Sequence, residues 1–251
     1  MNVERFQEFA KKAGAGASDV LRRVARRRRR GVETFDGTPL ERSFAASKAL
    51  AEDLWPKLVG RDGRSVRHVL VASPERGSGA SFVAAATAWR LAEHLRSAIA
   101  LVELDLESPR LAKILGIPAA SGTSEVLLGQ AELATSFAPV PTCPNLRVLL
   151  GGAARRLAPG EFATPAMERA RAELEQKCRT TIWIAPPLAT CADMRLFASR
   201  VDGVVLVTKS GGTKKDDLTR TLAMLDESGA SLIGAVLTGY DQPPPFVGRA
   251  A

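Results

Sequence analysis

The chain has 251 residues, of which 45% are apolar and 25% are charged, and its formal net charge is +8. This composition is that of an ordinary globular protein with one main core, and it excludes a disordered or fibrous chain. Three cysteines without C-x-x-C spacing argue against both a disulfide framework and a zinc site, and no charge-free stretch approaches the ~18 residues of a membrane span. We therefore expect a cytoplasmic protein.

The positive charge is concentrated at the start of the chain. Residues 1–30 contain ten Lys/Arg and three acidic residues, a net charge of +7, so the remainder is nearly neutral. We interpret residues 1–37 as a basic arm and linker whose arginines bind an anionic membrane surface or a partner protein. A solvated tail without a specific role and a nucleic-acid-binding arm are the alternatives, the latter disfavoured because no aromatic residues interleave with the arginines. The candidate binding residues are Arg22, Arg23, Arg26, Arg27, Arg28, Arg29 and Arg30.

Strand and helix patterns then alternate along the chain. After a predicted helix at 40–58, short apolar runs predict strands, and amphipathic stretches between them predict helices. The expected strands are 67–73, 98–105, 146–152, 180–185, 203–208 and 232–238; the expected helices include 81–96, 164–178 and 213–228. Thr213 and Asp216 form a capping-box-like pair at the start of the last helix. The pattern predicts an α/β fold, a doubly wound, mostly parallel sheet with ligands at the carboxyl ends of its strands.

The sequence VASPERGSGASF (71–82) lies between a predicted strand and a predicted helix. Its spacing is close to the phosphate-binding loop G-x-x-x-x-G-K-[ST], but alanine stands in the place of the lysine. Backbone N–H groups of such a loop, at a helix N-terminus, bind anions without any side chain. The candidate nucleotide-binding residues are Gly77, Ser78, Gly79, Ala80 and Ser81.

Six motifs in order give residues 38–241 a resemblance to the P-loop domain of bacterial tyrosine autokinases of capsule and exopolysaccharide synthesis, within the wider MinD/ParA group of ATPases. VASPERGSGAS resembles V-T-S-P-x-P-G-E-G-K-S, and LVELDLESPRLAKILGI resembles L-I-D-A-D-L-R-R-P-x-L-H-x-x-F-G. GTSEVLLGQAEL, NLRVLLGG with LAPGEFATPAM, IWIAPPLATCADMRLFASRVDGVVLV and IGAVLTGYD are similar to the remaining family motifs. The resemblance implies a P-loop NTPase-like domain at 38–241, with residues 242–251 as a C-terminal tail.

The departures from the family fall on its chemistry. Ala80 stands for the phosphate-binding lysine and Ile184 for the Walker B aspartate. We expect Trp183 to be a core residue of its strand and, beside Ile184, to make the former metal site apolar. Glu103 replaces the first aspartate of the family's D-x-D motif, while Asp105 keeps the second. Glu75 falls where MinD/ParA relatives carry a further lysine.

These losses predict that turnover is nearly abolished, because phosphoryl transfer depends on charge placed against the phosphate oxygens. Arg76 and Asp105 are the remaining candidates for catalytic residues, and Ser81 and Asp105 are the candidates for a weak metal site. We expect ATP or ADP with magnesium to bind weakly if it binds at all.

The family's phosphoacceptors and assembly helix are also altered. The resemblance implies a cluster of C-terminal tyrosines, whereas Tyr240 is the one tyrosine in the chain. In residues 40–50 only Glu41 keeps its place in the family's E-x-x-R-x-x-R pattern. Clustered trans-phosphorylation and ring assembly of the family type are therefore not expected, and homo-oligomerisation stays open.

We interpret the chain as a catalytically degenerate tyrosine-autokinase-like protein, a regulatory or docking component of exopolysaccharide or capsule synthesis or export. The resemblance implies a membrane partner of the chain-length-determinant, or polysaccharide co-polymerase, type. The arm would hold the protein peripherally at the inner face of the cell membrane. Two alternatives remain open, an active divergent ATPase or tyrosine kinase of the same pathway and a MinD/ParA-like positioning or DNA-partitioning protein.

Overall fold

The computed structural model describes residues 66–239. Its sheet has six strands, and every neighbouring pair of them is parallel, in the order β3-β2-β4-β1-β5-β6. The strands are β1 (His68–Ala72), β2 (Ile99–Glu103), β3 (Leu146–Leu149), β4 (Thr180–Ile184), β5 (Gly203–Lys209) and β6 (Leu232–Thr238). The predicted α/β fold with a doubly wound parallel sheet is confirmed.

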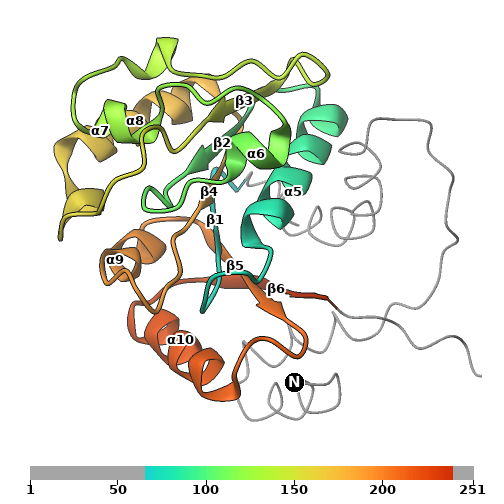
Figure 1. Ribbon diagram of the computed structural model, residues 1–251, viewed down its shortest axis with the longest axis vertical. Helices are drawn as coiled ribbons and strands as arrows, with labels where there is room; N and C mark the ends of the chain where they lie inside the picture. Colours follow the sequence, from blue (N-terminus) through green and yellow to red (C-terminus); the bar gives the residue numbers. More distant parts are fainter. Residues whose placement is uncertain (1–65, 240–251) are drawn as a thin grey trace, which may run out of the picture.

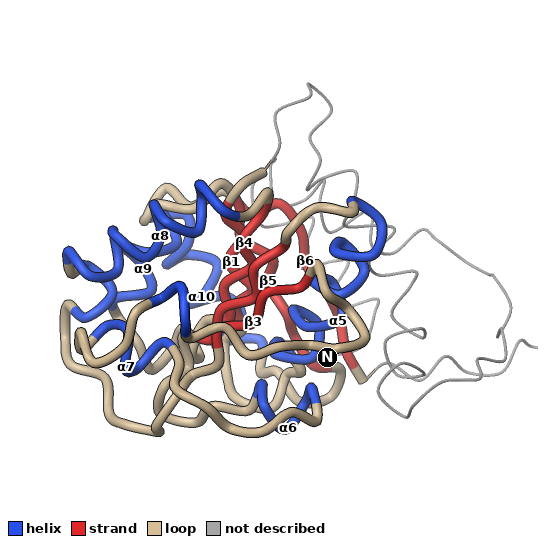
Figure 2. The backbone as a smooth tube through the Cα atoms, turned by 90° about the horizontal axis from the view of Figure 1, so that it is seen from above, coloured by secondary structure: helices blue, strands red, loops and turns tan. Residues whose placement is uncertain are grey.

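Helices cover both faces of this sheet, as Figures 1 and 2 show. The helix α5 lies on one face, and α8, α9 and α10 lie on the other. The helical segments are α5 (Ala80–Leu95), α6 (Leu111–Leu115), α7 (Thr123–Leu127), η1 (Leu133–Thr135), η2 (Glu161–Ala163), α8 (Pro165–Lys177), α9 (Asp193–Ser199) and α10 (Lys215–Glu227). Each helix packs an apolar face on the sheet, which is why the strands read as continuous apolar runs.

The two faces of the sheet form two separate cores. Because side chains alternate along a strand, Ile182 and Ile184 of β4 point to the α5 side, while Trp183 points to the opposite side. Trp183 is buried there, and its Nε1 donates a hydrogen bond to His68 Nδ1 at 3.2 Å. The expectation that Trp183 is a core residue is confirmed. The expectation that it makes the former metal site apolar together with Ile184 is wrong, because the two side chains lie on opposite faces of the sheet.

The predicted capping pair of α10 is also wrong. The helix begins at Lys215, its N-cap is Lys214, and no side chain caps it. Thr213 lies one residue further back, where its hydroxyl accepts a hydrogen bond from Lys209 N (2.8 Å) and donates one to Glu75 Oε1 (2.5 Å). Thr213 thus connects the segment after β5 to the loop that contains Glu75, and it does not cap α10.

Several predictions fall outside the described residues. These are the arginine arm, the helix at 40–58, the pattern at 40–50, Tyr240 and the tail at 242–251, so the predicted boundaries of the domain stay predictions. Within residues 66–239, no helix combines the length and the apolar character that crossing a bilayer requires.

Candidate functional site: a phosphate loop without its cation

The loop of residues 73–81, called here the phosphate loop, joins the central strand β1 to the start of α5. Gly77 and Gly79 have φ values of +85° and +88°, a left-handed conformation that other residues adopt only at a cost. Gly79 is the N-cap of α5, a helix of 16 residues. The two glycines therefore allow the left-handed turns with which the loop leads into α5.

Those N–H groups are free to bind a ligand. The backbone N–H groups of Gly77, Ser78, Gly79, Ala80 and Ser81 have no acceptor among the residues that the structure describes. Four orphan N–H groups and a partial positive charge are the general features of a helix N-terminus. The loop can accordingly hold an oxyanion with main-chain donors alone.

Hydrogen bonds from β6 and from the segment after β5 hold the phosphate loop in place. Thr238 at the end of β6 donates a hydrogen bond to Ser78 O at 2.6 Å, and its methyl group lies 3.4 Å from where a side chain on Gly79 would begin. Glu75 accepts the hydrogen bond from Thr213 described above. Glu75, the residue that replaces a lysine of MinD/ParA relatives, thus ties the phosphate loop to the segment after β5.

A hollow of about 480 Å³ opens above the loop, and we call it the phosphate-loop hollow. Its walls come from the carboxyl ends of three adjacent strands, β1, β2 and β4, where a parallel sheet normally binds ligands. The sequence-predicted residues Arg76, Gly77, Ser78, Gly79, Ala80, Ser81 and Asp105 all line it, together with Arg110 and Lys113.

Arg76 and Asp105, the two predicted catalytic candidates, bind each other. Arg76 Nη1 lies 2.5 Å from Asp105 Oδ2, and Arg76 Nη2 lies 3.7 Å from Glu107 Oε2. Asp105 Oδ1 is buried and has no hydrogen-bond partner within the described residues. The structure brings the two candidates together as an ion pair across the hollow rather than as an acid and a cation on a substrate.

Glu103 is fully used by the fold. Its Oε1 accepts hydrogen bonds from Arg110 N (2.6 Å) and Leu111 N (2.9 Å), and its Oε2 accepts one from Gly151 N (3.0 Å). Burial raises the pKa of Glu103, and these three backbone donors oppose that rise. The carboxylate fastens the start of α6 and the end of β3 to β2, so it is not a metal ligand.

The residues present do not fit the magnesium ion that the fold family implies. Such an ion takes oxygen ligands from carboxylates, a hydroxyl and phosphate. Ile184 is a fully buried apolar residue, Glu103 is occupied by N–H donors, and Asp105 is paired with Arg76. The described part of the chain contains no cluster of three His, Cys, Asp or Glu that could hold a metal.

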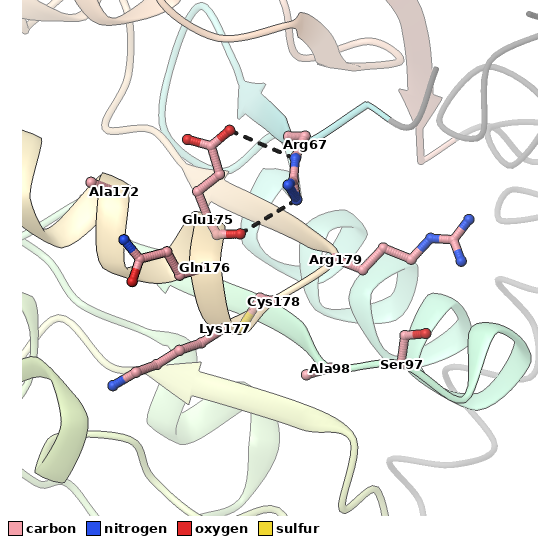
Figure 3. Close-up of a pocket in the computed structure, with 9 residues that line it drawn as sticks. All are labelled: Arg67, Ser97, Ala98, Ala172, Glu175, Gln176, Lys177, Cys178 and Arg179. Atoms are coloured by element: carbon pink, nitrogen blue, oxygen red, sulfur yellow. Dashed lines mark hydrogen bonds and ion pairs between the residues drawn. The ribbon is translucent and has the colours of Figure 1, made fainter. Parts of the chain in front are cut away.

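A second hollow lies at the amino ends of the strands, opposite the phosphate loop, and we call it the amino-edge hollow. It measures about 820 Å³ and is lined by residues around the starts of β1, β2 and β4, among them Arg67, Lys177 and Arg179. Figure 3 shows Arg67 turned toward Glu175, whose carboxylate Oε1 is 3.6 Å from Arg67 Nε, while Arg179 extends away without a partner in the view. Among the described residues Arg179 has no ion-pair partner.

The sheet order and the phosphate loop together define a P-loop NTPase-like fold. Similarity to known proteins narrows this class. Tyrosine-protein kinase YwqD of Bacillus subtilis (strain 168) is 24% identical over 176 residues, which cover 70% of this chain and 73% of the relative. No protein-family model matches the chain.

Solved structures, among them kinase domains, share the fold. The chimerical protein CapA2B2 superimposes with a TM-score of 0.72 at 22% identity, covering 80% of this chain and 91% of the other. The kinase domain of VpsO gives 0.69 at 20% identity (80% and 96% covered), and that of Escherichia coli ETK gives 0.68 at 16% identity (89% and 90% covered). ParA/MinD-like proteins are more distant, such as a plasmid partition protein of Borrelia burgdorferi with a TM-score of 0.52 at 14% identity (71% and 83% covered). The recognised resemblance to bacterial tyrosine kinase domains is confirmed.

Two basic residues that line the phosphate-loop hollow, Arg110 and Lys113, were not singled out from the sequence. Arg110 is the N-cap of α6 and Lys113 lies within that helix. Their position could have indicated this, because they follow the D-x-D-like motif at the end of β2 by a few residues. The segments after β1 and β2 meet at the carboxyl ends of the strands, where the phosphate loop lies.

Proposed function

We propose that this chain is a catalytically degenerate relative of the bacterial tyrosine autokinases that works by docking and regulation in exopolysaccharide or capsule synthesis or export. One observation carries the proposal: the phosphate loop keeps its shape and its free N–H donors, while the positions for the lysine and the Walker B carboxylate hold Ala80 and Ile184. Such a site retains binding and loses the charges on which phosphoryl transfer depends.

The proposed partner is a membrane protein of the polysaccharide co-polymerase type, and the proposed location is the inner face of the cell membrane. The arginines of residues 22–30 would bind anionic lipid, at about 1 kcal/mol for each Lys/Arg near the surface. The amino-edge hollow supports an orientation in which the amino ends of the strands face the membrane. It carries Arg67, Lys177 and Arg179, and of these Arg179 has no ion-pair partner among the described residues.

A vesicle experiment tests the membrane part of the proposal. Full-length protein and a variant lacking residues 1–30 are sedimented with vesicles of phosphatidylcholine alone or with 30% phosphatidylglycerol. We expect the full chain to bind the anionic vesicles in a salt-sensitive manner and the truncated chain to stay in solution. Equal sedimentation of both proteins would contradict the role of the arm.

A complementation experiment tests the non-catalytic part. In the host, loss of the gene should change the amount or the chain length of the surface polymer. We expect both the wild type and Ser81→Ala to restore it, because a docking role needs no magnesium-binding hydroxyl. Restoration by the wild type and failure by a stably produced Ser81→Ala protein would contradict the proposal.

An active, divergent kinase remains the second candidate, and the observation that bears on it is the ion pair of Arg76 with Asp105. Such an enzyme would need Arg76 on the phosphates and Asp105 on a metal. Each residue instead neutralises the other, which favours the degenerate form.

A further inference from the structure

The mismatch between this site and magnesium has a consequence for what the site binds. We propose that the phosphate-loop hollow takes a diphosphate-bearing anion without magnesium, and that Arg110, Lys113 and Arg76 supply the positive charge that the family draws from its lysine and its metal. The inference rests on the proposed function, because it assumes a site that binds without catalysing.

The first support is the arrangement of donors and cations. Five consecutive backbone N–H groups, from Gly77 to Ser81, lack acceptors within residues 66–239 and form one wall of the hollow. Arg110 and Lys113 form part of another wall, and neither has an ion-pair partner among the described residues. An anion between the two walls meets hydrogen-bond donors on one side and two uncompensated cations on the other.

The second support is the shortage of groups that would hold a metal. Two carboxylates line the hollow: Glu75 accepts a hydrogen bond from Thr213, and Asp105, whose side chain is 14% exposed, is paired with Arg76. A magnesium ion would have to displace the guanidinium and would then find no second carboxylate at Ile184. A free diphosphate, by contrast, needs only donors and positive charge, which the hollow already has.

Asp105 then has a role opposite to that of a metal ligand. It holds Arg76 at 2.5 Å and adds a negative charge to the wall, so it competes with any incoming anion. When an anion enters, Arg76 can exchange Asp105 and Glu107 for phosphate oxygens, to which a guanidinium binds bidentately. Removing the charge of Asp105 should therefore strengthen anion binding.

Isothermal titration calorimetry on the full-length protein tests this sign. The probes are ADP and inorganic pyrophosphate, each with excess magnesium and with EDTA. We expect ADP to bind in EDTA at least as tightly as with magnesium, and Asp105→Asn to bind about fivefold more tightly, as expected from the loss of one partly screened repulsive charge and the release of Arg76. Equal affinities for ADP and pyrophosphate would place recognition on the phosphates, whereas a preference for ADP would add a contact with the nucleoside.

Two variants separate the hollow from the basic arm. The double substitution Arg110→Ser/Lys113→Ser should weaken binding in EDTA about tenfold or more, while the arm stays intact in both proteins. Arg220→Ser on α10, whose side chain is 74% exposed, is the matched control and should bind as the wild type does. Thermal unfolding of each variant checks that its fold is retained.

Three outcomes would overturn the inference: binding that requires magnesium, weaker binding by Asp105→Asn, or no binding above the Arg110→Ser/Lys113→Ser level. None of these results alone removes the docking function, which the vesicle and complementation experiments test separately. Magnesium-dependent hydrolysis, in contrast, would remove both.

Discussion

At the scale of single residues, the acidic side chains near the hollow show that position decides the role of a carboxylate. Glu103 and Asp105 are two residues apart, yet Glu103 accepts three backbone hydrogen bonds and Asp105 pairs with an arginine. Glu103 therefore holds neighbouring segments of the fold together, whereas Asp105 neutralises the charge of Arg76. The sequence alone relates both to one family motif, in which Glu103 replaces the first aspartate and Asp105 stays a candidate catalytic and metal-binding residue.

Glu103→Ala should be strongly destabilising, because it leaves three backbone N–H groups without acceptors. Each buried donor that loses its partner costs about 1–3 kcal/mol, so we expect a loss of about 3 kcal/mol or more in the free energy of unfolding, measured by urea denaturation. Glu107→Ala is the control, since its side chain is 43% exposed and should change stability by less than about 0.5 kcal/mol. A loss below 1 kcal/mol for Glu103→Ala would contradict the structural role.

Glu125 gives a prediction for the pH dependence of stability. It accepts hydrogen bonds from Gly122 N (2.8 Å) and Ala153 N (2.9 Å). Burial by itself would raise the pKa of Glu125, but these donors outweigh it and lower the pKa below the ordinary value of 4.5.

A lowered folded-state pKa means that the stabilisation by Glu125 is present above about pH 4.5 and is lost as the pH falls through the folded-state pKa. The wild type should therefore be more stable than Glu125→Gln at pH 7, and the difference should shrink on acidification. Thermal unfolding of both proteins between pH 3 and pH 7 measures it. A gap that widens toward acid would show the opposite shift.

The sequence predicts the residues of the site that belong to a local motif, but not the contacts between distant residues. The phosphate loop, the missing lysine and the importance of Arg76 and Asp105 follow from local spacing, and the structure places all of them in one hollow. The Arg76–Asp105 pairing and the Thr238–Ser78 contact join residues 29 and 160 positions apart. Such contacts depend on how the strands are ordered, which no short motif encodes.

At the scale of elements, the six strands follow from their apolar runs, and each lies within or close to its predicted range. The helices α5, α8 and α10 were equally predictable because they are long enough to show an amphipathic period. The short helices α6, α7 and α9 were not, because five to seven residues make barely one or two turns. Their positions depend on contacts such as those of Glu103 and Glu125.

The uncapped start of α10 gives a stability prediction at this scale. Lys214 has the extended backbone of an N-cap residue (φ −74°, ψ 144°), yet its side chain cannot accept a hydrogen bond. Lys214→Asp should raise the free energy of unfolding by about 1 kcal/mol through a capping hydrogen bond and a favourable interaction with the helix dipole. Urea denaturation measures the gain, and Lys214→Ala, which removes the lysine without adding an acceptor, should show little of it. Equal stability of the two variants would mean that no cap forms.

At the scale of the whole molecule, the parallel sheet has one hollow at the carboxyl ends of its strands and another at their amino ends. The first is the phosphate-loop hollow, and the second is the amino-edge hollow, whose lining residues Figure 3 shows. An orientation with the amino edge on the membrane would leave the phosphate-loop hollow facing away from it.

This orientation predicts a contribution of Arg179 to vesicle binding. Arg179→Glu should weaken binding to vesicles with 30% phosphatidylglycerol about fivefold or more, since each basic residue near the surface is worth about 1 kcal/mol. Arg220→Glu makes the same change of charge on the exposed surface of α10 and should weaken binding less. Equal losses for the two variants would assign the effect to net charge and not to the amino edge.

The central claim is that this scaffold no longer cleaves a triphosphate, and phosphate release from ATP by the pure full-length protein tests it most directly. With magnesium present we expect no release above the protein-free blank, and no recovery in Ala80→Lys, because Ile184 still offers no carboxylate for a metal. Rapid, magnesium-dependent release by the wild type that Ser81→Ala or Asp105→Asn abolishes would contradict the account.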